Sequence, residues 1–296
     1  MLRKISSVLL VLFMVVSAIY ADDVYTSAPN YSAPYYAGSL NQNLLNEALE
    51  ELNYIRSLIG VPANVTLNDT YTNKAQHGAV LLDVIDTLTH TPSMPSDMSD
   101  EFYQLAYDAT THGNLAMGVT SLGQSLKLYM DDSDASNIDR IGHRRWLMNP
   151  RMKQVGFGLS TRKHYSATYV IEEAPEDYEK YQEWHKWPIS DEFITWPTHK
   201  SEHPLTYFDS NTAWCVVLNE DVFEKSNTSS VHVTLTRLSD YTTWNFSTSN
   251  TDGDFYDNQQ SYAYDECIIF RPDNATYKNG EEWRVDISGL TRKNGG

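Results

Sequence analysis

His90 and His143 are the residues of this chain whose type and setting point most directly to chemistry. An imidazole ligates zinc, copper or nickel, and two protein ligands leave coordination positions open for water or substrate. His143 lies within residues 138–158, which read IDRIGHRRWLMNPRMKQVGFG. Gly142 permits a close approach of the backbone, and Arg144 places positive charge beside the histidine. We therefore expect His143 on a short helical turn that leads directly into a strand.

This segment resembles the G-H-R, N-P and G-x-G pattern of the CAP superfamily. That family contains the cysteine-rich secretory proteins, the venom antigens and the plant pathogenesis-related proteins, and the double arginine is most similar to its bacterial-type branch. Residues 53–56 (NYIR) resemble a motif of the family's first helix, and residues 74–79 (KAQHGA) resemble its second. His90 stands where the family places its first site histidine.

The resemblance implies a central groove in which two histidines face each other and hold a divalent metal such as zinc. The groove residues that it implies in this chain are His90, Asn114, His143 and Arg144, with His90 and His143 as the metal ligands. The alternative is that each histidine only satisfies buried backbone carbonyl groups.

The acidic residues of the family's site are only partly reproduced. The G-E-N signature of the family aligns with His112–Leu115, so Gly113 stands in place of the glutamate. The second acid is Asp131 or Asp132, and Asp132 is a further candidate ligand. His112 could supply a third imidazole in place of the missing carboxylate, which would suit zinc, or it could be a solvent-facing loop residue.

Two main functions are consistent with these residues. The first is an exported binding or effector module without catalysis, whose groove takes a lipid, a glycan or a peptide from an extracellular molecule or a surface protein. The alternative is a secreted metal-dependent hydrolase, in which an ion on His90 and His143 activates water and Asp132 takes the proton. A third possibility is a structural surface protein dominated by its C-terminal part.

Residues 1–21 predict export. Arg3 and Lys4 precede an apolar run, and Ala21 is a small residue before the expected cleavage point, as in a secretory signal peptide. Later residues contain no apolar stretch long enough for a membrane span. The formal net charge of −17 makes nucleic acid an unfavourable partner. Six N-x-S/T patterns predict glycosylation in an exported chain, at Asn30, Asn64, Asn68, Asn227, Asn245 and Asn274.

The elements that position the histidines follow from periodicity and capping signals. Residues 22–40 show no periodicity and are interpreted as a linker. Helical spacing begins at Asn41, and Ser99 and Ser121 are expected to cap two later helices. Beyond residue 205 the pattern is short strands separated by turns. The prediction is an α+β protein: a CAP domain at 41–186, for which the resemblance implies a three-layer α-β-α sandwich, and an all-β, Ig-like sandwich at 187–296.

Cys215 and Cys267 are the two cysteines of the chain. Both lie in apolar, strand-like runs of the second domain, and an oxidising compartment favours a disulfide between them. The alternative is that they are two small buried side chains.

Overall fold

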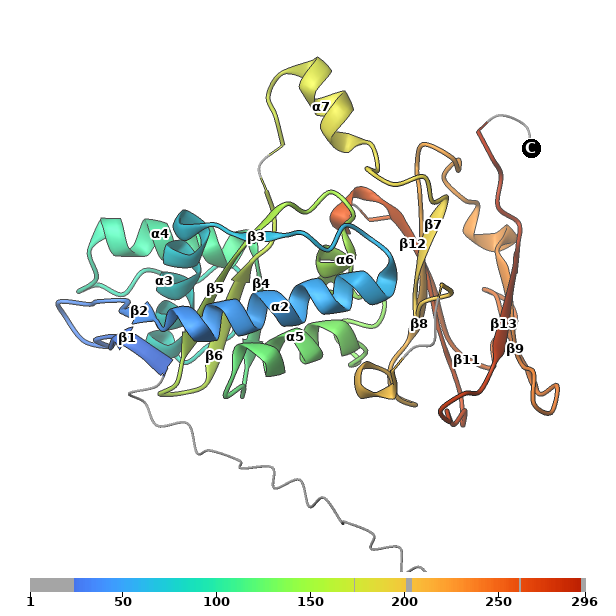
Figure 1. The fold of residues 1–296 in the computed structure, drawn as a ribbon, viewed down its shortest axis with the longest axis horizontal. Coiled ribbons are helices and arrows are strands. Elements are labelled where there is room, and N and C mark those ends of the chain that lie inside the picture. Colours follow the sequence, from blue (N-terminus) through green and yellow to red (C-terminus); the bar gives the residue numbers. More distant parts are fainter. Residues whose placement is uncertain (1–23, 173, 201–203, 261, 294–296) are drawn as a thin grey trace, which may run out of the picture.

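A computed structural model describes residues 24–172, 174–200, 204–260 and 262–293. Figure 1 shows two parts side by side: a sheet between helices, and a part built of strands that ends near the C-terminus. The α+β prediction is confirmed. The predicted signal peptide at 1–21 lies outside the described residues. Within the described ranges no helix is long and apolar enough to span a membrane.

The first part is organised around a four-stranded sheet in the order β3-β5-β6-β4. Its strands are β3 (Thr66–Leu67), β4 (Gly113–Met117), β5 (Gln154–Ser160) and β6 (Tyr165–Tyr169). β6 pairs antiparallel with both β4 and β5, and β3 runs parallel to β5. The strand expected after the turn that carries His143 is therefore β5, and β6 lies beside it.

Helices cover both faces of this sheet, as the three-layer prediction requires. α3 (Asp69–Ile85) and α4 (Asp100–Thr111) lie on one face, and α2 (Gln42–Ile59), α5 (Leu122–Asp131) and α6 (Gly142–Met148) lie on the other. Ser99 accepts a hydrogen bond from the amide of Phe102, and Ser121 accepts one from Gln124. Both predicted helix caps are thus confirmed.

The alternation of small and large residues in β5 explains how the layers pack. Val155, Phe157 and Leu159 are fully buried in the core that faces α2 and α5. On the opposite side, a Cβ atom on Gly156 would lie 2.2 Å from the backbone of Tyr71, and one on Gly158 would lie 2.1 Å from that of Ala75. Only glycine lets α3 lie this close to the strand.

The linker prediction for residues 22–40 is wrong where the structure describes them. β1 (Tyr25–Ser27) pairs antiparallel with β2 (Ser39–Leu40), and Val24, Tyr25 and Leu40 are buried in the main core. The Tyr25 hydroxyl donates a hydrogen bond of 3.1 Å to the carbonyl oxygen of Leu159. The segment lacks periodicity because its strands are too short to repeat a pattern, yet it packs against the end of β5.

The second part contains two antiparallel sheets, as predicted for an all-β domain. One has the order β11-β12-β8-β7 and the other β10-β9-β13. The strands are β7 (Phe193–Trp196), β8 (Trp214–Leu218), β9 (His232–Arg237), β10 (Thr243–Phe246), β11 (Gly253–Asn258), β12 (Glu266–Pro272) and β13 (Trp283–Ser288). Phe246 and Phe270 join the two sheets, with ring centroids 5.2 Å apart.

Short helices complete the fold. α7 (Tyr178–His185) projects from the connection between the two parts and buries none of its residues. Three single turns of 3-10 helix, η1 (Leu205–Tyr207), η2 (Thr228–Ser230) and η3 (Tyr262–Tyr264), lie in the strand-rich part.

The predicted disulfide is wrong, because Cys215 and Cys267 are both free and buried. They lie on the adjacent strands β8 and β12, where Cys215 faces Ile269 and Cys267 faces Val217. The cysteines are therefore diagonal neighbours, and their thiols interact without being bonded to each other. They act as small buried side chains.

Candidate functional site

His90 lies in the loop between α3 and α4, and its orientation is fixed by the end of α4. Its Nδ1 atom is 2.7 Å from the carbonyl oxygen of Thr110. A carbonyl oxygen only accepts, so Nδ1 carries the proton and Nε2 of the neutral ring keeps its lone pair. Desolvation by the surrounding protein lowers the pKa of His90, and the charges of His143 and Arg140 lower it further. The ring is therefore held in the neutral form that ligates a metal.

His143 begins α6 and is held at two points by Asp132. The Nδ1 atom of His143 lies 2.8 Å from Oδ1 of Asp132, and its backbone N–H donates to Oδ2 at 2.8 Å. Asp132 ends α5 in the left-handed conformation (φ +40°), and only 2% of its side chain is exposed. Because the carboxylate occupies Nδ1, Nε2 is the ring nitrogen of His143 left for a ligand.

The two imidazoles lie near each other, with ring centroids 6.4 Å apart and an angle of 23° between the planes. A metal–nitrogen bond of about 2.0–2.1 Å places each centroid about 3.2 Å from an ion, so two rings on a tetrahedral ion have centroids about 5.2 Å apart. The rings would have to approach by about 1 Å to share one tetrahedral ion. Tyr129 supports His143 from α5, with ring centroids 5.4 Å apart. His90 and His143 are thus the pair of imidazoles that a small approach of the rings would bring onto one ion.

Asn114 supports the site from beneath and does not line a groove. It is 1% exposed, and its side-chain amide donates a hydrogen bond of 2.9 Å to the carbonyl oxygen of His143. The hydroxyl of Tyr129 donates to the carbonyl oxygen of Asn114 at 3.0 Å. The predicted groove residue Asn114 is therefore a positioning residue for the turn that carries His143.

The glutamate that the family places before Asn114 has no room in this chain. A Cβ atom on Gly113 would lie 2.6 Å from the carbonyl oxygen of Ala109 and 3.0 Å from that of Thr168. Any side chain at this position would force α4 and β6 apart. The lack of a side chain at Gly113 thus allows α4 and β6 to lie in close contact.

His112 is not brought together with the other two histidines. Its Nδ1 atom is 2.9 Å from the carbonyl oxygen of Asp108 and 3.0 Å from the carboxylate of the same residue. Its ring stacks on Tyr169, with centroids 5.7 Å apart. In the part of the chain that the structure describes, no three histidine, cysteine, aspartate or glutamate residues gather to hold a metal ion. The predicted three-histidine site is therefore not formed, since Asp108 and Tyr169 fix His112.

The comparison with protein families agrees with this geometry. Residues 49–172, which include both histidines and Gly113, match the model of the cysteine-rich secretory protein family, CAP. The first part of the chain is a CAP domain. The resemblance predicted from residues 138–158 is confirmed, whereas the bacterial-type branch stays a prediction. Members of this family are generally secreted. No curated protein and no solved structure matches the chain.

Arg144 of the CAP domain does not point into a ligand groove, contrary to the prediction. The residue is 0% exposed. Its guanidinium donates to the carbonyl oxygens of Met130 and Ala213, each at 2.6 Å, and to the hydroxyl of Ser133 at 3.1 Å. Ala213 precedes β8, so Arg144 joins the helices that carry the site to the β domain.

Arg145 and Arg151 extend the same interface. Arg145 donates to the side-chain oxygen of Asn258 at 2.8 Å, and Arg151 forms an ion pair of 2.7 Å with the buried Asp265. Arg144, Arg145 and Arg151 thus all bind groups of the β domain. Sequence reasoning missed this role because positive charge next to a histidine also suggests an anion site. The available signal was their position on either side of the apolar residues Trp146, Leu147 and Met148.

Proposed function

We propose that this protein is an exported binding module whose CAP domain holds a divalent ion such as zinc between His90 and His143. The observation that carries the proposal is the engagement of both Nδ1 atoms, by Thr110 and Asp132. This leaves Nε2 as the ligating atom of each ring. An ion bound there would supply a positive charge with open coordination positions for an oxygen or nitrogen donor of an extracellular ligand. A small ligand, a glycan or a surface protein could present such a donor.

Binding without turnover is better supported than hydrolysis. The hydrolase alternative assigns to a carboxylate the step that takes a proton from metal-bound water. Gly113 leaves no space for the glutamate of the family, and Asp132 already accepts bonds from His143 and from the backbone N–H of Arg144, at 3.3 Å. Asp132 is therefore occupied as an orienting residue and is a poor general base.

Isothermal titration of zinc into the full chain tests the proposal. We expect saturable binding to the wild type and at least a tenfold loss for His90→Ala and for His143→Ala. His112→Ala is the matched control and should bind as the wild type does, because Asp108 and Tyr169 hold this histidine away from the pair. Equal zinc affinity in all four proteins would exclude the site. Zinc-stimulated turnover of an ester or peptide that His143→Ala abolishes would favour the hydrolase instead.

Glycosylation is part of the same proposal of an exported protein. Asn30, Asn64, Asn227, Asn245 and Asn274 are exposed, as glycan acceptors must be. Asn68 is half-buried, and it caps α3: its side-chain oxygen accepts from Tyr71, and its amide donates to Gln154 at 3.0 Å. We therefore propose that glycans attach at the five exposed positions and that Asn68 is skipped. Mass mapping of glycopeptides from protein secreted by eukaryotic cells checks this pattern.

A further inference from the structure

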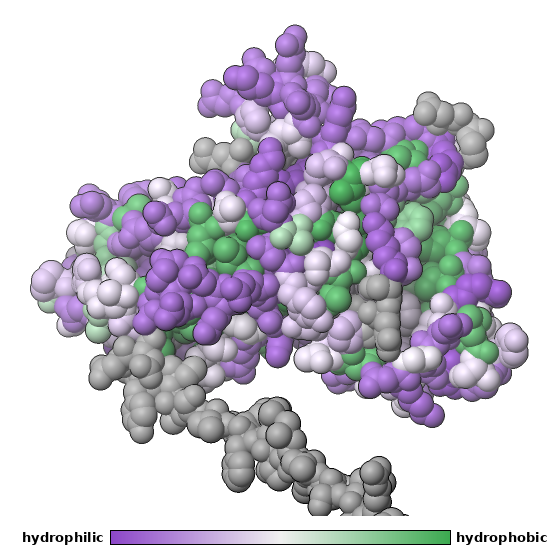
Figure 2. Space-filling view, viewed as in Figure 1, coloured by the Kyte–Doolittle hydropathy of each residue, from purple (hydrophilic) through white to green (hydrophobic). Residues whose placement is uncertain are grey.

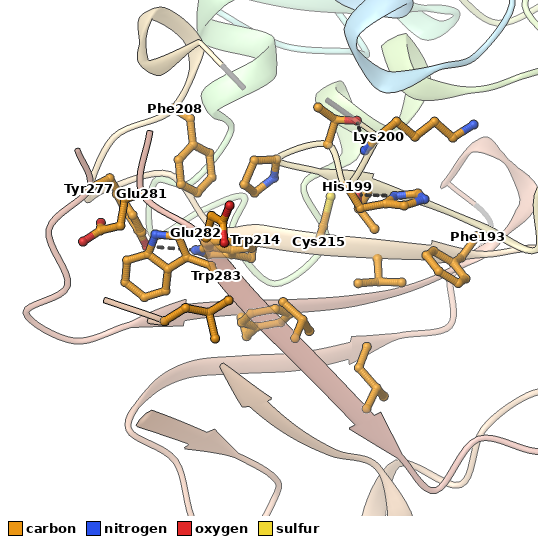
Figure 3. Close-up of a pocket in the computed structure, with 18 of the residues that line it drawn as sticks. Phe193, His199, Lys200, Phe208, Trp214, Cys215, Tyr277, Glu281, Glu282 and Trp283 are labelled. Carbon is orange, nitrogen blue, oxygen red and sulfur yellow. Dashed lines mark hydrogen bonds between the residues drawn. The ribbon is translucent and has the colours of Figure 1, made fainter. Parts of the chain in front are cut away.

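The β domain contains a cavity of about 1000 Å³ between its two sheets, whose lining does not include His90 or His143. Its lining includes Trp214, Val216, Phe270, Trp283, Val285 and Ile287. Figure 3 shows Trp214, Trp283, Phe208 and Tyr277 gathered at one end of the cavity, and Phe193 and His199 at the other. Figure 2 shows hydrophobic side chains exposed on the strand-rich part of the molecule. Protein interiors leave few voids larger than a water molecule, so an opening of this size needs an explanation.

The cavity exists because the sandwich is open along one side. β7 ends one sheet and β13 ends the other, and neither has a second neighbouring strand among the described residues. The outward residues of β13, Arg284, Asp286 and Ser288, are exposed as expected, but the inward residues Trp283, Val285 and Ile287 are only half-buried. Equivalent inward residues of the central strand β9, Val233 and Leu235, are fully buried. The interior face of β13 therefore lacks part of its packing.

Two of the cations at the mouth of the cavity are paired with carboxylates. Arg292 forms an ion pair with Glu192, and Lys200 forms one with Asp191 at 2.8 Å. Lys278, Glu281 and Glu282 bring both signs to the remaining rim. The rim therefore carries both positive and negative side chains and offers no patch of one charge to a charged ligand. Such a mouth favours an uncharged ligand.

A hydrogen-bonding group is nevertheless present on the rim. His199 lines the cavity, and its Nδ1 atom lies 3.0 Å from the hydroxyl oxygen of Thr195 on β7. Burial lowers the pKa of His199, and the charge of Lys200 lowers it further. The imidazole can exchange a hydrogen bond with a hydroxyl or carbonyl group.

We propose that this cavity binds an uncharged, elongated apolar molecule with one hydrogen-bonding end, of the class of neutral lipids. The apolar positions from Trp283 to Ile287 extend over about 13 Å of strand, enough to lie along an acyl chain. In this proposal the aromatic end of the cavity contacts the apolar part of the ligand, and Thr195 and His199 bind the polar end of the ligand. This site lies in the β domain and does not depend on the metal site proposed for the CAP domain.

Titration of the full chain with N-phenyl-1-naphthylamine, an uncharged fluorescent probe of apolar sites, tests the inference. We expect saturable binding of one probe per chain, with energy transfer from tryptophan because Trp214 and Trp283 line the cavity. Val285→Trp should fill the cavity and weaken binding at least tenfold. Asp286→Trp places the same side chain on the outer face of β13 and should bind as the wild type does.

Three further measurements make the result decisive. Thermal melting shows that each variant is folded, and Ile287→Phe replaces Val285→Trp if that variant is not. The anionic probe 1-anilinonaphthalene-8-sulfonate should bind at least tenfold more weakly than the uncharged probe. His143→Ala should bind the uncharged probe normally, which separates this site from the metal site. Absence of saturable binding to the wild type, equal loss in the Val285 and Asp286 variants, or equal affinity for both probes would overturn the inference.

Discussion

The Nδ1 atom of His143 lies 2.8 Å from one carboxylate oxygen of Asp132, and the second oxygen accepts the backbone N–H of the same histidine. One buried side chain therefore fixes both the ring and the helical turn that carries it. The same residue ends α5, because the backbone of Asp132 adopts the left-handed conformation there. The end of α5, the start of α6 and the orientation of His143 thus all depend on Asp132.

Asp132→Asn tests this dependence. Asparagine has one acceptor oxygen, and its NH₂ group would face an N–H donor of His143 or Arg144. An unsatisfied buried group costs about 1–3 kcal/mol, so we expect the free energy of unfolding in urea to fall by that amount. Loss of an orienting partner should also weaken zinc binding by about 10–100-fold. Asp139→Asn, at an exposed carboxylate, is the control, and equal stability of the two variants would contradict the prediction.

Arg144→Met should destabilise the protein more than any exposed arginine substitution. The substitution leaves the buried carbonyl oxygens of Met130 and Ala213 without their donor. Hydrogen bonds to a charged group are worth about 1.5–3 kcal/mol each, so the expected loss is roughly 3 kcal/mol or more. Arg284→Met removes an exposed arginine of β13 and should change stability by less than about 0.5 kcal/mol. Chemical denaturation of both variants makes the comparison.

Two glycine-to-alanine substitutions in the CAP domain should have opposite signs. Gly113→Ala brings a methyl group within 2.6 Å of a backbone oxygen, and we expect it to destabilise the fold by about 1–3 kcal/mol. Gly123 lies in α5 with nothing within 4 Å of an added Cβ atom. Gly123→Ala should stabilise the protein by up to about 0.5 kcal/mol, because alanine has a higher helix propensity than glycine and this position lies in the first turn of α5. Melting temperatures that move in the same direction for both variants would refute this account.

The contribution of His90 to the stability of the protein should fall as the pH is lowered from 7 to 5. The pKa of His90 is lowered in the folded protein by desolvation, so the unfolded chain binds more protons. The contribution of His90 is fully present above its unfolded pKa of about 6.5 and is lost as the pH falls towards the folded pKa. His77 and His199 are shifted in the same direction, also by burial. His90→Asn should therefore reduce, without abolishing, the decrease in urea midpoint between pH 7 and pH 5.

Local sequence determined the elements and the family of the first domain. The alternation around Val155–Leu159 forms β5, Ser99 and Ser121 cap their helices, and residues 138–158 carry the pattern of a CAP domain. These features depend on neighbours in the chain, because backbone conformation and capping act over a few residues.

Only the tertiary structure decided which side chains remain available for function. Arg144 stands next to the site histidine in sequence, yet its guanidinium reaches Ala213 in the other domain. A Cβ atom on Gly142 would lie 2.9 Å from the ring of Tyr262, so this glycine serves the contact between the domains. Cys215 and Cys267 lie on the neighbouring strands β8 and β12, but each faces a residue two positions away from the other cysteine. Each outcome depends on contacts between residues about fifty or more positions apart, and short motifs carry no information on such contacts.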